Sequence, residues 1–238
     1  MWPASKSLRA HTRVVWDLLG RGLDGEPLPM QIRLVEAAIY EDMASLWNLI
    51  HERANAEHVD TLLRERKTLL ALCRAAVAAA VHFVEAYLNG LAFDHLASHE
   101  NDVSDDDRSA LFEWDFKKTG SRFLSLREKV LRYQRIILNV QHAPVQPSNC
   151  AELATLLGIV EGIRNPLAHP GPHISPRSGL PDKELAIFDI TVATVREAVD
   201  VAIAAVRRLE EAVHGNLLAV DWLRSRTSEG TFPPEAFD

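Results

Sequence analysis

The chain has 238 residues, a formal net charge of −7 at pH 7, 47% hydrophobic residues and 25% charged residues. This composition supplies enough apolar material for the core of a soluble globular domain, so no disulfide or structural metal is needed. The acidic balance excludes a protein whose whole surface attracts nucleic acid, but it allows a local cluster of cations. The two cysteines, Cys73 and Cys150, are too few for a disulfide framework.

The sequence carries no pattern of a secretory signal or a membrane span. The apolar run that follows the first basic residues is broken by Asp17. The most apolar stretch, residues 69–84, is alanine-rich and is interrupted by Arg74 and His82. It falls short of the ~20 apolar residues that a membrane-spanning helix requires. We therefore expect a cytoplasmic protein that does not enter the membrane.

The N-terminal part of the chain predicts a helical extension over residues 1–58. A weak helical pattern over residues 5–20 leads through a glycine- and proline-rich connector to a stronger helix over residues 30–56. Apolar residues of this second helix recur three and four positions apart, which indicates one buried face. The members of that face are Leu34, Val35, Ala38, Ile39, Leu46, Trp47 and Ile50.

A long helix is predicted over residues 59–97, with small apolar side chains nearly all round its centre at 75–81. A helix that is apolar on every side is typical of a central position, and alanines allow neighbouring helices to approach closely. His82, Glu85 and Asn89 follow at helical spacing, so they project from one face. The simpler interpretation of these three is a solvated stripe or polar groups satisfied in the core.

Two further helices are predicted after an acidic turn, one over residues 108–117 and one over residues 121–141. In the turn, Ser104 followed by Asp107 has the pattern of a helix start. The second helix concentrates cations in an acidic protein, with Phe123 and Tyr133 interleaved as rings on which bases could stack. A solvated basic face is the simpler alternative. The candidate RNA-contacting cations are Arg122, Arg127, Lys129 and Arg132.

Irregular structure is expected between Pro144 and Pro181, where seven of the twelve prolines lie. A helix over residues 149–163 is predicted inside this region, and a last long helix over residues 189–226 follows it. Residues 229–238 are expected to form a flexible tail. Strand alternation, an internal repeat and a glycine-rich phosphate loop are all missing from the sequence, so the predicted fold class is all-α.

Three polar residues, Arg164, Asn165 and His169, lie within six positions where a helix meets the proline-rich loop. Pro166 disfavours helical dihedrals at Asn165, so the helix should stop or kink there. Histidine exchanges a proton near neutral pH, arginine offers a fork of donors for phosphate, and an amide can orient the imidazole or a ribose hydroxyl. Metal-free RNA cleavage needs such groups, because a general base must take the 2′-OH proton and a cation must stabilise charge on the phosphate oxygens. The simpler alternative is an arginine and a loop histidine that satisfy carbonyl groups at the helix end.

Metal binding is the other chemistry that ten histidines suggest. His95 and His99 lie four apart on a predicted helix, with Glu100 and Asp102 close behind. No third ligand is defined, and no glutamate follows the first histidine as in the zinc-protease helix. We therefore expect solvent-exposed histidines, no metal and no cofactor. A di-metal helical bundle built on these histidines and the acidic turn is the least favoured hypothesis.

The hexamer Arg164-Asn-Pro-Leu-Ala-His169 resembles the R-x4–6-H signature of the HEPN superfamily (higher eukaryotes and prokaryotes nucleotide-binding domain). That signature favours a polar residue directly after the arginine. The helix Ala151–Val160 is similar to the family helix that carries the arginine, and Val84–Asn89 is similar to the family's first core helix. The resemblance covers residues 60–215. The chain departs from the family pattern by the proline inside the hexamer, by the long 94–146 interval and by its N-terminal extension.

The resemblance implies a HEPN-type helical bundle over residues 59–228 that dimerises and joins two motifs across a composite cleft. Carried over by position, Arg164 would bind the scissile phosphate, His169 would act as general acid or base, and Asn165 would orient the imidazole or the ribose. Glu85 would hold Arg164 or His169 by a charge-assisted hydrogen bond, with Asn89 as a further supporting residue. Many family members are metal-independent endoribonucleases of toxin–antitoxin, abortive-infection or other defence systems.

The leading hypothesis is therefore a homodimeric endoribonuclease, a toxin or antiviral effector. It would cut RNA to leave 2′,3′-cyclic phosphate ends and would be controlled by an antitoxin or another regulatory partner. The alternative hypothesis is a non-catalytic module of the same fold that binds a nucleotide or a partner protein, because other members of the family have lost catalysis.

Overall fold

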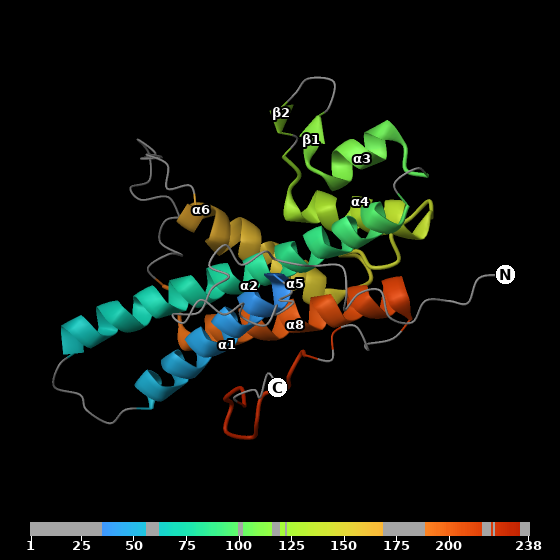
Figure 1. The fold of residues 1–238 in the computed structure, drawn as a ribbon. Coiled ribbons are helices and arrows are strands. Elements are labelled where there is room, and N and C mark those ends of the chain that lie inside the picture. Colours follow the sequence, from blue (N-terminus) through green and yellow to red (C-terminus); the bar gives the residue numbers. More distant parts are fainter. Residues whose placement is uncertain are drawn as a thin grey trace, which may run out of the picture.

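The computed structural model describes residues 35–55, 62–99, 102–115, 120–121, 123–168, 189–215, 220 and 222–233 (Figure 1). These residues are mostly helical, which confirms the all-α class. The helices in chain order are α1 (Val35–Ala54), α2 (Leu62–Ser98), α3 (Asp105–Leu111), α4 (Leu126–Leu138), α5 (Ala151–Ile159), η2 (Val160–Arg164), α6 (Asn165–Ala168) and α8 (Val192–His214). The two-residue strands β1 (Trp114–Asp115) and β2 (Gly120–Ser121) pair antiparallel. The helix predicted at 5–20 lies outside the described residues.

Helix α2 is the longest described helix and the centre of the core. Figure 1 shows α1 and α8 running beside it, and both helices pack against it. Ala76, Val77, Ala80 and Val81 are fully buried at its middle, as the run of small side chains predicts. Small residues allow the neighbouring helix axes to come close, because no long side chain separates them.

By length and composition alone, residues Arg66–Ser98 of α2 qualify as a candidate membrane span. The expectation that this region falls short of a span was therefore wrong. In the structure, 44% of the qualifying window is buried inside the described fold. The core helix of a soluble protein meets the same test, so a single such helix gives weak support for a membrane location.

Helix α1 belongs to the same core as α2 and α8, although the sequence places it in an N-terminal extension. Tyr40, Met43, Trp47 and Ile50 are fully buried on its inner face. The rings of Tyr40 and Phe83 of α2 lie 5.5 Å apart between centroids, in a tilted arrangement. Of the apolar stripe predicted for this helix, Trp47 and Ile50 are buried, whereas Val35 and Ala38 are exposed, so the prediction was only partly right.

Local capping sets the boundaries of α3 and α4. Ser104 accepts a hydrogen bond from the Asp107 amide and caps α3, as predicted. A reciprocal capping box between Ser125 and Glu128 starts α4, four to five residues later than the predicted start at 121. Helix α3 ends at Leu111 because the chain turns into the β1–β2 hairpin, with Glu113 at a φ of 53°. The helix predicted over 108–117 is therefore present, but its predicted bounds were wrong, since it begins at Asp105 and ends at Leu111.

Helix α8 ends at His214, with Gly215 in the left-handed conformation at φ 71°. The prediction of one helix over 189–226 was therefore wrong. The described residues that follow, 222–233, are not helical and form hydrogen bonds to α1. Phe232 is 2% exposed, and its backbone exchanges two hydrogen bonds with the Asn48 side chain, at 2.9 and 3.1 Å. Residues 229–233 are thus packed in place, whereas we expected a flexible tail there.

Candidate functional site

The chain carries Arg164 on a π-helical turn. Helix α5 ends at Ile159, residues Val160–Arg164 form η2, and one α-helical turn follows as α6. The Asn165 amide donates to the Val160 carbonyl, five residues back. Because the proline at 166 has no N–H, the regular i→i−4 ladder cannot pass this point, and the wide turn lies directly before it. The dihedrals of Asn165, φ −65° and ψ −44°, are helical, so the expectation of a non-helical Asn165 was wrong.

The structure brings together three of the residues that the sequence singled out. Arg164 Nη2 lies 3.6 Å from Glu85 Oε2 of α2, and their side chains are 19% and 23% exposed. Arg164 Nη1 donates to Asn165 Oδ1 at 3.3 Å. At 3.6 Å the Arg164–Glu85 contact is an ion pair without a direct hydrogen bond. It fixes the guanidinium between α2 and η2, and screening is reduced because both groups are mostly buried.

Two other predicted site residues do not join this cluster. His169 lies outside the described residues. Asn89 lies one turn further along α2 than Glu85, and its Oδ1 accepts from Lys129 Nζ of α4 at 3.3 Å. Asn89 therefore links α2 to α4, and among the described residues the polar cluster consists of Glu85, Arg164 and Asn165.

The predicted basic face of α4 is only partly present at the surface. Arg122 lies outside the described residues, and Arg127 is exposed. Lys129 is buried at 6% exposure, and its ammonium forms an ion pair with Glu113 in addition to the contact with Asn89. Arg132 pairs with Asp106. Lys129 cannot contact RNA in this arrangement, because its charge is used inside the fold.

The two aromatic residues expected to stack on bases differ in exposure. Tyr133 is fully buried, and its hydroxyl donates to the Ala110 carbonyl at 3.4 Å. The expectation that it can stack on a base was wrong, because α3 covers it. Phe123, directly before the α4 cap, is 80% exposed.

The histidine pair at the C-terminal end of α2, His95 and His99, shows no metal-binding arrangement among the described residues. The His95 and His99 rings stack with centroids 4.6 Å apart. Burial, and secondly the neighbouring His99, lower the pKa of His95 below its usual range. In the described part of the chain, no group of three or more His, Cys, Asp or Glu residues could hold a metal ion. Glu100 lies outside that part, so the di-metal hypothesis finds no support within it.

Sequence reasoning missed a buried carboxylate in the core. Glu210 of α8 is fully buried and accepts a hydrogen bond from the Tyr87 hydroxyl of α2 at 2.5 Å. A buried carboxylate is normally hydrogen-bonded because its desolvation is costly. The only sequence signal was an acidic residue, Glu210, on the apolar face of the last helix. The pair fixes α8 against α2 on the inside of the bundle.

In the Arg164 cluster, the partly exposed guanidinium lies beside the Asn165 amide and is paired with the Glu85 carboxylate. A guanidinium held in this way presents fixed donors that suit a phosphate oxygen. The π-helical turn that carries it is a conformation found frequently at functional sites. Comparisons of the chain with protein-family models, with curated proteins and with solved structures found no match.

Proposed function

We propose that the protein is a metal-independent endoribonuclease of the HEPN type. The observation that supports this proposal is the placement of Arg164 by Glu85 at the end of the helix that carries the R-x4–6-H hexamer. An arginine oriented by a carboxylate from another helix is prepared to receive a phosphate, since less side-chain freedom is lost on binding. Asn165, bonded to Arg164, supplies the adjacent amide.

The proposed reaction is an in-line attack of the ribose 2′-oxygen on the neighbouring phosphorus. A general base takes the 2′-OH proton, the bond from phosphorus to the 5′-oxygen breaks, and an acid returns a proton to that oxygen. The products are a 2′,3′-cyclic phosphate and a 5′-hydroxyl. His169 is the proposed acid or base, and Arg164 stabilises charge on the non-bridging oxygens. Asn165 orients the imidazole or the ribose.

A composite site between two chains is part of the same proposal. In the resembling family two R-x4–6-H motifs face each other across a dimer cleft, so a homodimer in the cytoplasm is proposed here, controlled by an antitoxin or another regulatory partner. The mass of the purified protein in solution tests this point directly. A monomer that cleaves RNA would contradict the shared cleft.

Cleavage of a labelled single-stranded RNA in excess EDTA is the decisive measurement. We expect fragments that end in 2′,3′-cyclic phosphate and no cleavage of the same strand carrying 2′-O-methyl groups. Arg164→Ala and His169→Ala should each reduce kcat/KM by about 100-fold or more, the range of a lost oxyanion donor or general base. Arg53→Ala and His142→Ala are matched controls, because both side chains are exposed outside the cluster.

Activity that disappears with EDTA and survives His169→Ala would refute the proposal. The alternative is a non-catalytic module of the same fold, which binds a nucleotide or a partner protein. The ion pair of Arg164 with Glu85 and its hydrogen bond to Asn165 favour it, because a guanidinium with two partners inside the chain can serve a structural purpose. A protein that leaves all RNAs intact yet binds a nucleotide in an Arg164-dependent way would establish this alternative.

A further inference from the structure

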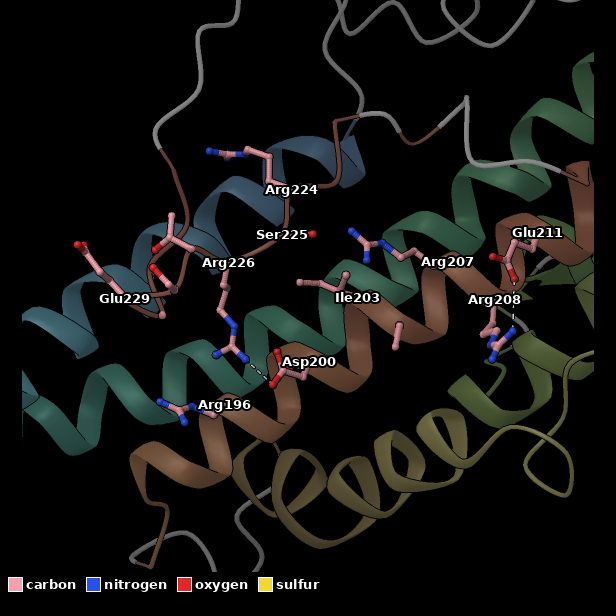
Figure 2. A pocket seen from close by; sticks show the side chains of 14 residues that line it. Arg196, Asp200, Ile203, Arg207, Arg208, Glu211, Arg224, Ser225, Arg226 and Glu229 are labelled. Atoms are coloured by element: carbon pink, nitrogen blue, oxygen red, sulfur yellow. Dashed lines mark hydrogen bonds and ion pairs between the residues drawn. The ribbon is translucent and has the colours of Figure 1, made fainter.

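A second polar site lies between α8 and the C-terminal segment, away from Arg164. It is a groove of about 760 Å³, and Figure 2 shows side chains from both walls. One wall is a single face of α8 from Arg196 to Glu211, and the other is residues 224–230. At 1.5 Å of rise per residue the α8 wall is about 22 Å long, which is much longer than one phosphate group.

The lining concentrates positive charge in a protein of net charge −7. Five arginines and three acidic residues line the groove, and one of the arginines, Arg224, is paired with Glu41 of α1. The arginines are Arg196, Arg207, Arg208, Arg224 and Arg226, and the acidic residues are Asp200, Glu211 and Glu229. This excess of cations gives the groove a local attraction for anions that the overall charge does not predict.

Two of the three carboxylates are already paired with arginines of the groove. Arg226 Nη2 lies 2.5 Å from Asp200, and Arg208 Nη1 lies 3.5 Å from Glu211, as the dashed lines in Figure 2 mark. Each pair is close to neutral, so Asp200 and Glu211 oppose an incoming anion little, and the attraction for an anion comes mainly from the arginines outside these pairs.

Two arginines of the lining have no carboxylate partner among the described residues. Arg196 lies over the Trp47 ring, with its guanidinium carbon 5.7 Å from the ring centroid. Arg207 makes one long hydrogen bond, 3.5 Å, to the Leu223 carbonyl. Each guanidinium has five N–H donors, so most of the donors of both groups remain available to a ligand in the groove.

The C-terminal wall adds small hydroxyl side chains. Ser225, Thr227 and Ser228 all line the groove. The turn that presents them is held by hydrogen bonds from the Thr227 amide to the Thr231 carbonyl, 2.8 Å, and from the Gly230 amide to the Thr227 carbonyl, 3.0 Å. Guanidinium and hydroxyl groups together are the usual donors to phosphate oxygens in protein–nucleic acid complexes.

We propose that this groove binds the phosphodiester backbone of a single-stranded nucleic acid. Its volume of about 760 Å³ over about 22 Å gives a mean width of roughly 6–7 Å, enough for one strand. A whole duplex is too wide to enter, because it is broader than its own major groove, which is already about 12 Å wide. Trp47 is fully buried beneath the arginines, so it offers no ring to a base. The proposed contacts are therefore to phosphates, and binding should not depend on the base sequence.

The probe for the test is a fluorescent single-stranded DNA 20-mer of mixed sequence, which has no 2′-OH and so resists the proposed cleavage. Anisotropy titrations at several salt concentrations would give Kd. We expect Arg196→Gln/Arg207→Gln to weaken binding by about 10-fold or more and to lower the salt slope by roughly 1.4, about 0.7 for each lost phosphate contact. Ser225→Glu, which adds an anion to the same wall, should weaken it as well.

Arg66→Gln/Lys67→Gln is the matched control, because it removes the same charge from exposed positions at the start of α2. Equal losses in the two double variants, or no loss in either, would overturn the proposal. Competition by ATP or inorganic phosphate as effective as that of the oligonucleotide, at equal phosphate concentration, would also overturn it in favour of a small ligand. Thermal melts of all variants identify any that fail to fold.

No residue of η2 or α6 lines the groove, so this inference stands apart from the ribonuclease proposal. Groove-dependent binding of DNA by a protein that leaves RNA intact would refute only the ribonuclease proposal. If the protein cleaves RNA but the groove variants bind DNA as well as the unchanged protein does, only the proposal for the groove is refuted.

Discussion

The Glu85 carboxylate lies 3.6 Å from the Arg164 guanidinium and connects the central helix to the π-helical turn. Glu85→Gln keeps the shape of the side chain and removes its charge, so Arg164 should lose its orientation. We expect RNA cleavage to fall by about 10-fold in kcat, with a stability change on the order of 1 kcal/mol, because the 3.6 Å ion pair includes no direct hydrogen bond. Single-turnover cleavage and urea unfolding measure the two effects.

His82→Ala is the matched control for Glu85→Gln. His82 is exposed one turn earlier on the same helix, and its loss should leave cleavage unchanged. If Glu85→Gln cleaves RNA as fast as the unchanged protein, Glu85 does not position Arg164.

Pro166→Ala should tighten the π-helical turn. Alanine restores the amide that an i→i−4 bond to the Gly162 carbonyl requires, so η2 can rewind into regular α-helix. We expect the unfolding free energy to rise by about 1–2 kcal/mol. Removing proline from a helix gains ~3 kcal/mol, and part of this gain is lost because alanine gives the unfolded chain more conformational entropy. Cleavage should fall because Arg164 rotates away from Glu85.

The measurements for Pro166→Ala are urea unfolding, helical circular dichroism and RNA cleavage. Pro147→Ala, in the loop before α5, is the control and should change none of them by much. A Pro166→Ala protein with unaltered stability and unaltered cleavage would show that the proline does not maintain the wide turn.

Alkaline pH should destabilise the fold through Tyr40. Burial raises the pKa of Tyr40 to about 12, although the hydrogen bond from the Arg224 backbone acts in the opposite direction. In the unfolded chain the Tyr40 hydroxyl ionises near pH 10. Its contribution to the unfolding free energy is therefore fully present below about pH 10 and is lost as the pH rises toward 12. The expected loss is on the order of 2 kcal/mol, at up to about 1.4 kcal/mol per pH unit.

Urea unfolding of Tyr40→Phe at several alkaline pH values tests this assignment. The variant should be less stable near neutral pH, because the Tyr40 hydroxyl bonds both the amide and the carbonyl of Arg224 at 3.0 Å. Its stability should then decline less steeply above about pH 10. The slope that remains is assigned to Tyr133, whose pKa burial also raises. An unchanged slope would contradict the Tyr40 assignment.

Phe232→Ala should cost about 3 kcal/mol of unfolding free energy, the lower end of the range for a buried phenylalanine. Phe232 is 2% exposed and lies edge-on to Tyr40, with ring centroids 5.9 Å apart. Phe123→Ala is the matched control, because its ring is 80% exposed and its loss should cost less than about 0.5 kcal/mol. Equal denaturant midpoints for the two variants would mean that residues 229–233 do not stabilise the fold.

Local patterns were enough to predict the central helix, and together with the family resemblance they predicted part of the polar cluster; Asn89, also expected there, bonds Lys129 instead. The small residues of α2 have one structural use, close packing on several sides, and its bounds, Leu62–Ser98, lie near the predicted 59–97. Glu85 and Arg164 were singled out separately by helical spacing and by the hexamer, and the structure places them in contact.

Contacts between distant segments explain what the sequence did not predict. Gly215 is a typical helix-stop residue, yet the apolar residues after it continue a helical pattern. Among the described ones, Trp222 packs against Tyr40 of α1 and Phe83 of α2. Lys129 has the spacing of a surface cation but is buried, because Glu113 at a positive φ supplies a carboxylate from the hairpin. The periodicity of a segment does not show which distant residue will pack against it or pair with it.

The attachment of the C-terminal segment to α1 has a consequence during synthesis. The Trp47 indole donates to the Gly230 carbonyl, and the Tyr40 hydroxyl bonds Arg224, 184 positions later in the chain. At about 5–20 residues per second, translation reaches these partners roughly 10–40 s after α1 has been made. Until then, the part of the aromatic face of α1 that the C-terminal segment covers stays exposed on the nascent chain, and exposed apolar surface of this kind is prone to aggregation.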